Sequence, residues 1–311
     1  TKLHSMTTLM LSHRDCEKHV MLPHHPESPA RLQSIRDAID ANPPGDSLRR
    51  RDARELAREC FAGVHPDHYL DMLSELDPGD GIARIDADTS LNRHSLRAAL
   101  LAAGAAVEAV EAVLAGEARN AFCAVRPPGH HAETAIGMGF CIFNNVALAA
   151  ERALSLGAER VAVVDFDVHH GNGTAEIFLE RPDVMVCSSF QYPFYPGRFD
   201  DVDAEHIVLT PLPAGTGGSE FRQAVERDWL PALAAHRPDV LLVSAGFDAH
   251  REDPLAGLEL DDEDYSWVSE LLLDAAERHC NGRLVSTLEG GYNIDALGRC
   301  VLRHVQALCA A

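Results

Sequence analysis

The chain has 311 residues, of which 46% are hydrophobic, and a formal net charge of −21. This apolar content can form a large core, and because no linker rich in Pro, Gly or Ser interrupts the chain, we expect a single domain over residues 6–311. The acidity argues against nucleic acid and anionic membranes as partners. It favours cationic substrates such as Lys-rich peptides or polyamines, although plain solubility would also account for it.

Several sequence features indicate a cytoplasmic protein. The first residues, TKLHS, are expected to be a remnant of expression before a natural start at Met6, and no signal peptide is evident. The longest apolar-rich segment, residues 98–116, carries Glu108 and Glu111, so it is expected to be an amphipathic helix and not a membrane span. The eight cysteines are at least nine residues apart, which predicts reduced thiols and neither a C-x-x-C zinc site nor a disulfide framework.

The first part of the chain is predicted to be mainly helical. A strand is expected over residues 10–14, and a loop rich in Pro and His follows it. In that loop His24 and His25 are expected to be surface or packing residues and not metal ligands. Helices are expected over residues 30–41, with Pro29 near the first turn, and over 52–60, 66–76 and 98–116, with a polar loop at 80–93.

From residue 121 onward the sequence repeats a short apolar strand, a polar loop and a helix, which is typical of a parallel sheet with right-handed crossovers. The expected strands are residues 121–125, 160–166, 184–189, 240–245 and 283–288. The expected helices are residues 143–156, 219–236, 263–280 and 294–308. We therefore predict a three-layer α/β/α fold with a mostly parallel central sheet. Ligands bind beyond the carboxyl ends of such strands.

Residues 161–174, VAVVDFDVHHGNGT, place the densest set of metal-binding side chains at one of these ends. Asp165, Asp167 and His169 are spaced two apart, so in extended geometry they point to the same side, and a carboxylate and an imidazole can share one ion. The glycines at 171 and 173 allow a sharp turn. An ordinary strand end followed by a turn would need fewer Asp, His and Gly residues, so that interpretation is disfavoured.

Five motifs carry a resemblance to a known family. They are RPPGHHA (126–132), GFCIFNN (139–145), VDFDVHHGNGT (164–174), SAGFDAH (244–250) and LEGGYN (288–293). Together they resemble the histone deacetylase family, and they are most similar to its class II and bacterial amidohydrolase members. The resemblance runs from the Pro/His loop to the end of the chain. It implies an arginase-like fold and the hydrolysis of acetylated amines on one catalytic zinc.

The resemblance implies that the zinc ligands are Asp167, His169 and Asp248, although an isolated Asp248 would equally well cap a helix. Three protein ligands leave one coordination position open, as a hydrolytic zinc requires. A structural potassium ion is also implied, at Asp165, Asp167, His169 and Ser188. Backbone carbonyls would supply most of its ligands.

The family also assigns catalytic roles. His131 is expected to be the general base and acid, while His130 orients the water. Asp165 is expected to hydrogen-bond His130, and Asn172 to pair with His131, at a position where class I members have Asp. Tyr292 is expected to donate its phenol to the substrate carbonyl.

A narrow tunnel for the acyl-lysine side chain is implied as well. Its expected residues are Gly139, Phe140, Tyr195, Leu255, Gly290 and Gly291. Tyr195 stands where Phe is more usual, and Leu255 stands where relatives that act on acetylpolyamines tend to have an acidic residue. Asp88 is expected to stand at the start of a helix. The alternative, that it binds substrate backbone amides at the rim of the tunnel, is disfavoured.

The expected function is therefore zinc-dependent deacetylation of acetyllysine in peptides or proteins. An acetylpolyamine amidohydrolase is the nearest alternative, since it uses the same chemistry on a small cation. A non-catalytic binder of acetyllysine is disfavoured by the complete set of ligands and by Tyr292. An arginase relative is disfavoured because arginases use two manganese ions and other acidic motifs. A homo-oligomer is compatible with the sequence.

Overall fold

The computed structural model describes residues 7–76 and 78–311, so the expected remnant 1–5 and the expected start at Met6 lie outside the described residues. Within them, eight strands form one sheet in the order β2-β1-β5-β10-β9-β6-β7-β8, and every neighbouring pair is parallel. The strands are β1 (Thr8–Ser12), β2 (Leu48–Asp52), β5 (Asn120–Cys123), β6 (Val161–Asp165), β7 (Val184–Gln191), β8 (Ile207–Leu212), β9 (Val240–Ala245) and β10 (Leu284–Leu288). A separate antiparallel pair consists of β3 (Ala83–Arg84) and β4 (Ser90–Leu91).

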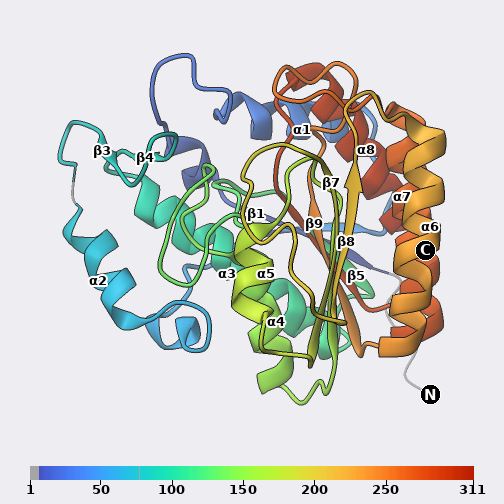
Figure 1. Cartoon of the computed structure of the whole chain (residues 1–311). Helices are drawn as coiled ribbons and strands as arrows, with labels where there is room; N and C mark the ends of the chain where they lie inside the picture. The colour runs from blue at the N-terminus through green and yellow to red at the C-terminus, as the bar shows by residue number, and fades with distance from the viewer. Residues whose placement is uncertain (1–6, 77) are drawn as a thin grey trace.

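Helices cover both faces of the large sheet. The α-helices are α1 (Ala30–Ala41), α2 (Asp67–Glu75), α3 (Ser95–Leu114), α4 (Asn145–Ser155), α5 (Asn172–Phe178), α6 (Gly218–His236), α7 (Asp262–Cys280) and α8 (Ile294–Ala310). Two short 3-10 helices, η1 (Arg14–Lys18) and η2 (Arg58–Phe61), complete the set of described helices. Helices α1, α6, α7 and α8 pack on one face, and α3, α4 and α5 pack on the other (Figure 1). The predicted three-layer α/β/α fold is confirmed.

The central strands are apolar because both of their faces are covered. In β6, residues 161–164 are Val, Ala, Val and Val, and all four are fully buried. Continuous apolar runs of this kind are typical of strands inside a parallel sheet. The polar residues begin only at the carboxyl end, where Asp165 lies beside Ser188 of β7 and Ser244 of β9. The register therefore gathers the polar ends of three strands at one edge.

Some predicted elements were wrong. The helix expected over residues 52–60 is absent, since residues 48–52 form β2 and only residues 58–61 are helical. The sequence LRRRD of β2 has a single apolar residue because this strand is an exposed edge. Asp88 lies in the segment between β3 and β4 and does not lead a helix. Strand β8 and helix α5 were not predicted, whereas the helix expected over residues 30–41 is present with those bounds.

Within residues 7–76 and 78–311, no helix combines the length and the apolar content that a bilayer span requires.

Candidate active site

Three side chains with metal-binding atoms meet at the carboxyl ends of β6 and β9. Asp167 and His169 follow β6, and Asp248 follows β9; one donor atom from each lies within 4.8 Å of the others. His169 Nδ1 is 3.1 Å from an Asp167 oxygen and 3.2 Å from an Asp248 oxygen. All three residues are buried. The structure therefore brings together the set that the sequence analysis expected to bind zinc.

The surroundings of this cluster fit a cation. Asp248 Oδ1 accepts a hydrogen bond from Val168 N at 2.9 Å, but its buried Oδ2 accepts no well-aligned hydrogen bond. His169 Nδ1 lies 3.2 Å from this oxygen but is not well aligned with it. A buried carboxylate oxygen that is poorly satisfied in this way is costly unless it binds an ion. Burial lowers the pKa of His169, yet the carboxylates of Asp167 and Asp248 outweigh it and raise that pKa to about 10. Two carboxylates and an imidazole are also the donor types of a hydrolytic zinc site, so these residues fit the ion that the family implies.

The tandem histidines lie beside this cluster, after β5. Their ring centroids are 4.0 Å apart. His130 Nδ1 is 2.8 Å from Asp165 Oδ2, and His131 Nδ1 is 2.7 Å from Asn172 Oδ1. Both pairings are those expected from the sequence, and all four side chains are buried.

The two imidazoles differ in charge. Burial by itself lowers the pKa of His130, but nearby carboxylates, led by that of Asp165, outweigh it and raise this pKa well above its ordinary value. Burial lowers the pKa of His131 well below its ordinary value, and the neighbouring His130 and His169 add to the effect. These surroundings favour the neutral form of His131 and the charged form of His130.

Tyr292 and Phe140 form one side of the site. Tyr292 follows β10 and is almost fully buried, and its ring meets that of Phe140 edge to face, with centroids 5.8 Å apart. Gly139 has a φ of +57°, and a Cβ there would collide with the His131 ring, so this position requires glycine. Gly290 has a similar steric constraint, because a Cβ would collide with carboxylate oxygens of the metal-binding cluster. Gly291 follows it with a φ of +121°.

Tyr195 lies on the opposite side. Its ring meets those of His131 and His169 edge to face, with centroids 5.3 and 5.9 Å apart. The neighbouring Phe194 stacks on His169 at 5.4 Å. Tyr195 thus contacts His131 and His169, while Phe140 contacts Tyr292.

Leu255 is half-buried in the loop after β9, and its backbone N–H donates to Asp253 Oδ1 at 3.0 Å. The other oxygen of Asp253 accepts from Tyr292 N at 2.7 Å and from Asn293 N at 3.2 Å. One carboxylate thus joins the loop of Leu255 to the loop of Tyr292. The sequence analysis did not identify Asp253.

Two further residues that hold the site were also missed. Glu289 accepts from the backbone N–H groups of Gly129 and His130 at 2.7 and 3.1 Å, which fixes the loop of the tandem histidines. It lies in the quoted LEGGYN motif, but was given no role. Arg31 of α1 donates to the carbonyl oxygens of Glu289 and Gly291, and its guanidinium lies 5.0 Å above the Tyr292 ring. No local sequence signal links Arg31 to residues about 260 positions away.

Ser188, expected at the potassium site, lies beside Asp165 in the ladder between β6 and β7. Its hydroxyl is 2.9 Å from His170 Nδ1. Next to Phe140, Asp88 Oδ1 accepts from Gly139 N at 3.1 Å, and the His25 ring contacts the Phe140 ring with centroids 4.7 Å apart. His25 is thus a packing residue, which agrees with the prediction.

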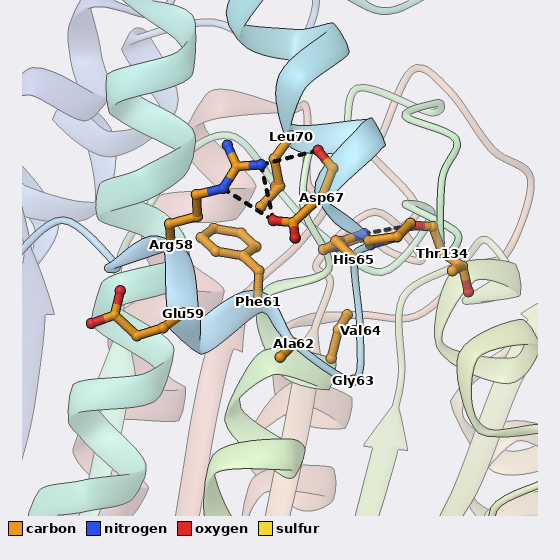
Figure 2. A pocket seen from close by; sticks show the side chains of 11 residues that line it. Arg58, Glu59, Phe61, Ala62, Gly63, Val64, His65, Asp67, Leu70 and Thr134 are labelled. Carbon is orange, nitrogen blue, oxygen red and sulfur yellow. Dashed lines mark hydrogen bonds and ion pairs between the residues drawn. The ribbon is translucent and has the colours of Figure 1, made fainter.

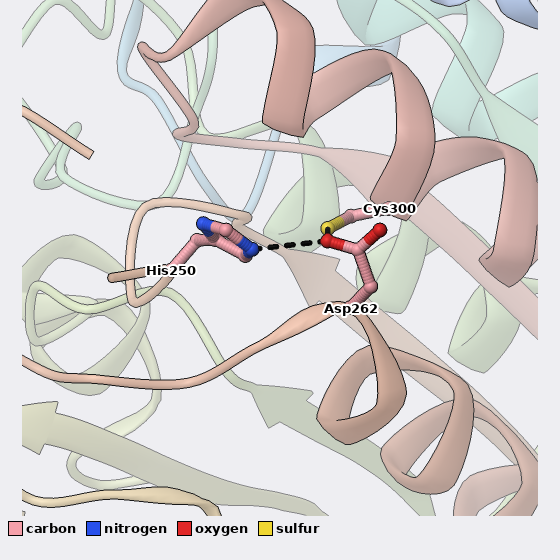
Figure 3. A group of neighbouring side chains, drawn as sticks. All are labelled: His250, Asp262 and Cys300. Atoms are coloured by element: carbon pink, nitrogen blue, oxygen red, sulfur yellow. Dashed lines mark hydrogen bonds and ion pairs between the residues drawn. The ribbon is translucent and has the colours of Figure 1, made fainter. Parts of the chain in front are cut away.

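A second group of metal-binding residue types, His250, Asp262 and Cys300, does not have the properties of a metal site (Figure 3). His250 Nδ1 accepts from Glu252 N at 3.1 Å, so the proton is on Nε2, which lies 3.0 Å from Asp262 Oδ1. Neither ring nitrogen is free to bind an ion. Burial also raises the pKa of Cys300, which keeps the thiol protonated.

A groove of about 690 Å³ lies apart from this centre, between η2 and the start of α2 (Figure 2). The imidazole in its lining, His65, is fully engaged: Nδ1 is 3.0 Å from Thr134 O, and Nε2 accepts from Asn144 N at 2.9 Å. Arg58 at the groove is paired with Asp67 and Asp71. The groove therefore offers no reactive group comparable to the cluster at β6 and β9.

Comparisons with known proteins agree with this geometry. A family model described as histone deacetylase domain matches residues 25–308. The chain is 39% identical over 292 residues to a histone deacetylase-like amidohydrolase of Pseudomonas aeruginosa, and the match covers 91% of this chain and 77% of that protein. It is 37% identical to a probable deacetylase of Archaeoglobus fulgidus, with 93% and 82% covered. The crystal structure of the HDA15 HD domain is similar with a TM-score of 0.91 at 33% identity, covering 98% of this chain and 88% of that one.

Proposed function

Because this chain belongs to the histone deacetylase family, and is therefore a hydrolase of the deacetylase or amidohydrolase kind, we propose that it removes acetyl groups from the side-chain amine of acetyllysine in peptides or proteins. We further propose that one zinc ion binds to Asp167, His169 and Asp248. The observation that carries the proposal is that these three side chains converge within 4.8 Å, beside the tandem histidines. Neither a binding protein nor a structural site needs a neutral and a charged imidazole next to such a cluster.

Zinc bound there supplies a Lewis acid that polarises the substrate carbonyl and makes a water molecule more acidic. The neutral His131 accepts the proton of the attacking water and returns it to the leaving amine. The charged His130, held by Asp165, stabilises the negative charge that develops on the amide. Burial raises the pKa of Tyr292 well above its ordinary value, so the phenol stays protonated and donates a hydrogen bond to the carbonyl oxygen.

The proposed substrate class rests on the two aromatic walls and on Leu255. Phe140 and Tyr195 suit the methylene groups of a lysine side chain, because aromatic rings pack well against an aliphatic chain. An acetylated polyamine carries a second ammonium group. The apolar Leu255 provides no partner for a buried ammonium, whereas it packs readily against a peptide.

We also propose a structural potassium site at Asp165, Asp167, His169 and Ser188. The adjacent positions of Asp165 and Ser188 on β6 and β7 support it. Such an ion would hold the strand end that carries two of the zinc ligands. Replacement of potassium by a large organic cation in the buffer should then lower the thermal stability of the protein, and no change would argue against the site.

The proposed substrate class is tested by comparing turnover of an acetyllysine peptide with that of acetylspermidine on the zinc-loaded protein. We expect kcat/KM for the peptide to exceed that for acetylspermidine by at least about tenfold, which requires only about 1.4 kcal/mol of differential transition-state binding. Leu255→Glu should shift the ratio toward the polyamine. A wild-type preference for acetylspermidine would show that the protein is the alternative enzyme, an acetylpolyamine amidohydrolase, which its net charge of −21 would also suit.

A further inference from the structure

A chain of hydrogen bonds continues from the catalytic histidine beyond its immediate partner. Asn172 Nδ2 donates to Glu133 Oε1 at 2.7 Å. Both carboxylate oxygens of Glu133 are in turn bound by Arg198, with Nε and Nη2 each at 2.7 Å. Glu133 is 3% exposed, whereas the Arg198 side chain is 45% exposed. The contacts thus lead from His131 through two buried side chains to a cation at the surface.

The carboxylate of Glu133 is the nearest of the acceptors that determine which way the amide of Asn172 points, since His131 O and Met138 Sδ lie farther away, at 3.4 and 3.5 Å. An ionised carboxylate only accepts hydrogen bonds, so the NH₂ group of Asn172 must face Glu133. The amide oxygen of Asn172 then faces His131 Nδ1 at 2.7 Å. An oxygen acceptor requires a proton on Nδ1, which leaves the lone pair of His131 on Nε2. Without Glu133, a rotated amide would instead donate to Nδ1 and place the proton on Nε2.

Arg198 connects this arrangement to the substrate tunnel. It lies three residues after Tyr195, on the segment whose Phe194 stacks on His169. Its two parallel hydrogen bonds to Glu133 form the geometry in which an arginine fixes a carboxylate most firmly. A buried carboxylate that lost this partner would be an uncompensated charge. The ion pair therefore fixes the carboxylate of Glu133 relative to the segment that contains Tyr195.

We propose that Glu133 is a positioning residue that sets the tautomer of His131 through Asn172, and that Arg198 holds Glu133 in place and anchors the segment of Tyr195 to it. The proposal rests on the proposed function, since it assigns a purpose to the base of that reaction. It also explains how a neutral Asn serves beside the base: the negative charge is placed one residue farther out, on Glu133.

An exchange of the two side-chain types tests the proposal. In Glu133→Gln, an amide oxygen in place of Oε1 would still accept from Asn172 Nδ2 and Arg198 Nε, and only Arg198 Nη2 would meet the new NH₂ group. Glu133→Leu, which removes both acceptor oxygens, is therefore the single variant that frees the amide of Asn172. In Asn172→Asp, two carboxylates face each other at hydrogen-bond distance and repel. In the variant that carries both Glu133→Gln and Asn172→Asp, the new glutamine donates to the new aspartate and accepts from Arg198 Nη2. The new aspartate also accepts from His131, so the chain is restored except that Arg198 Nε loses its acceptor.

We expect Glu133→Leu and Asn172→Asp each to lower kcat for an acetyllysine peptide at least tenfold with KM changed less than threefold. The double variant, Glu133→Gln with Asn172→Asp, should recover most of the kcat that Asn172→Asp loses. Glu176→Gln is the matched control, because Glu176 accepts from Thr134 N and Oγ1 of the same loop at 2.8 Å without contacting Asn172, and it should leave kcat unchanged. A double variant that is less active than Asn172→Asp, or an unaltered kcat in Glu133→Leu, would refute the proposal.

Nitrogen-15 NMR of the histidine side chains gives a second readout that needs no turnover. His131 of the wild type should show a protonated Nδ1 and an unprotonated Nε2, and Glu133→Leu should lose this single tautomer while the zinc content stays the same. An unchanged tautomer in that variant would contradict the proposal even if kcat falls. A wild-type protein that shows the Nδ1–H tautomer but hydrolyses no acetylated amine would instead contradict the proposed function and leave the positioning role intact.

Discussion

Asp253 offers a demanding test of how the oxyanion donor is held. Its Oδ2 accepts from Tyr292 N at 2.7 Å and from Asn293 N at 3.2 Å, and its Oδ1 accepts from Leu255 N at 3.0 Å. The residue is 7% exposed, so water does not readily replace these contacts. Asp253→Asn keeps the shape but replaces one acceptor oxygen with an NH₂ group. In either orientation of the amide, at least one buried N–H group loses its acceptor.

A buried donor left without a partner costs about 1–3 kcal/mol. We therefore expect Asp253→Asn to lower the free energy of unfolding by that amount. Displacement of a catalytic group by about 1 Å can lower a rate by about 100-fold, so we expect kcat to fall between about 10- and 100-fold. The zinc content should not change, because Asp253 holds the backbone of Tyr292 and is not one of the three proposed zinc ligands.

The assay is steady-state turnover of an acetyllysine peptide in four proteins: wild type, Asp253→Asn, Tyr292→Phe and the double variant. If Asp253 acts through the phenol, the double variant should have the same kcat as Tyr292→Phe, because the hydroxyl that Asp253 positions is already absent. Glu252→Gln serves as the control, since Glu252 is the preceding acidic residue and forms a half-exposed ion pair with Arg299. If the two substitutions lower kcat independently, so that the double variant is slower than Tyr292→Phe, the reasoning is refuted.

Three further predictions follow from single contacts. Tyr292→Phe should lower kcat by about 100- to 1,000-fold and change KM little, as measured by peptide turnover, because one oxyanion donor contributes about 3–4 kcal/mol. Gly290→Ala should weaken zinc binding in a chelator competition, because the new Cβ would collide with Asp248, while Gly257→Ala, with its nearest neighbour at 3.5 Å, should bind zinc normally. His304→Gln should flatten the pH dependence of unfolding, because burial lowers the pKa of His304 from 6.5 to about 4. The stability that comes from this depressed pKa is complete above pH 6.5 and is lost as the pH falls toward 4. Between pH 7 and pH 5, the free energy of unfolding measured by urea titration should therefore fall by about 2 kcal/mol less in the variant than in the wild type.

Each of these has a result that contradicts it. Unchanged turnover in Tyr292→Phe would remove the phenol from the mechanism. Equal zinc affinities in the two glycine variants would mean that the cluster can move aside for a methyl group. Parallel pH profiles for His304→Gln and the wild type would show that this imidazole is protonated as easily in the folded as in the unfolded chain.

Part of the proposed zinc site could be expected from local sequence. Asp167 and His169 lie two residues apart at the end of an apolar strand, whereas Asp248, which follows another such strand, was assigned through the family resemblance. In a parallel sheet the ends of the strands meet at one edge, so the fold class itself brings these residues together.

The residues that hold the site could not be predicted in the same way. Arg31 contacts the backbone of Gly291, and Glu133 contacts Asn172, across separations that no periodicity encodes. Their hydrogen bonds are directed to backbone or amide groups whose positions only the folded chain defines. Glu289 lay within a recognised motif. Only the folded structure shows that its carboxylate accepts hydrogen bonds from the N–H groups of another loop.

The missed elements have a physical reason too. Strands are predicted from apolar patterns that reflect burial, but the two edge strands of the sheet are partly exposed. Strand β2 is basic, and strand β8 contains Pro211, which is tolerated because β8 has a partner on one side only. Helix α5 begins at Asn172, inside a motif whose polar residues were assigned to chemistry and not to a helix.

The central claim, that a single zinc ion on Asp167, His169 and Asp248 drives amide hydrolysis, is tested most directly by titrating zinc into the protein after removal of metals with a chelator. Acetate release from an acetyllysine peptide should rise in proportion to added zinc and reach a plateau at one equivalent per chain, and Asp248→Asn should show neither the rise nor tight binding. Full activity in the chelated protein, or a plateau that requires two equivalents of metal, would contradict the account.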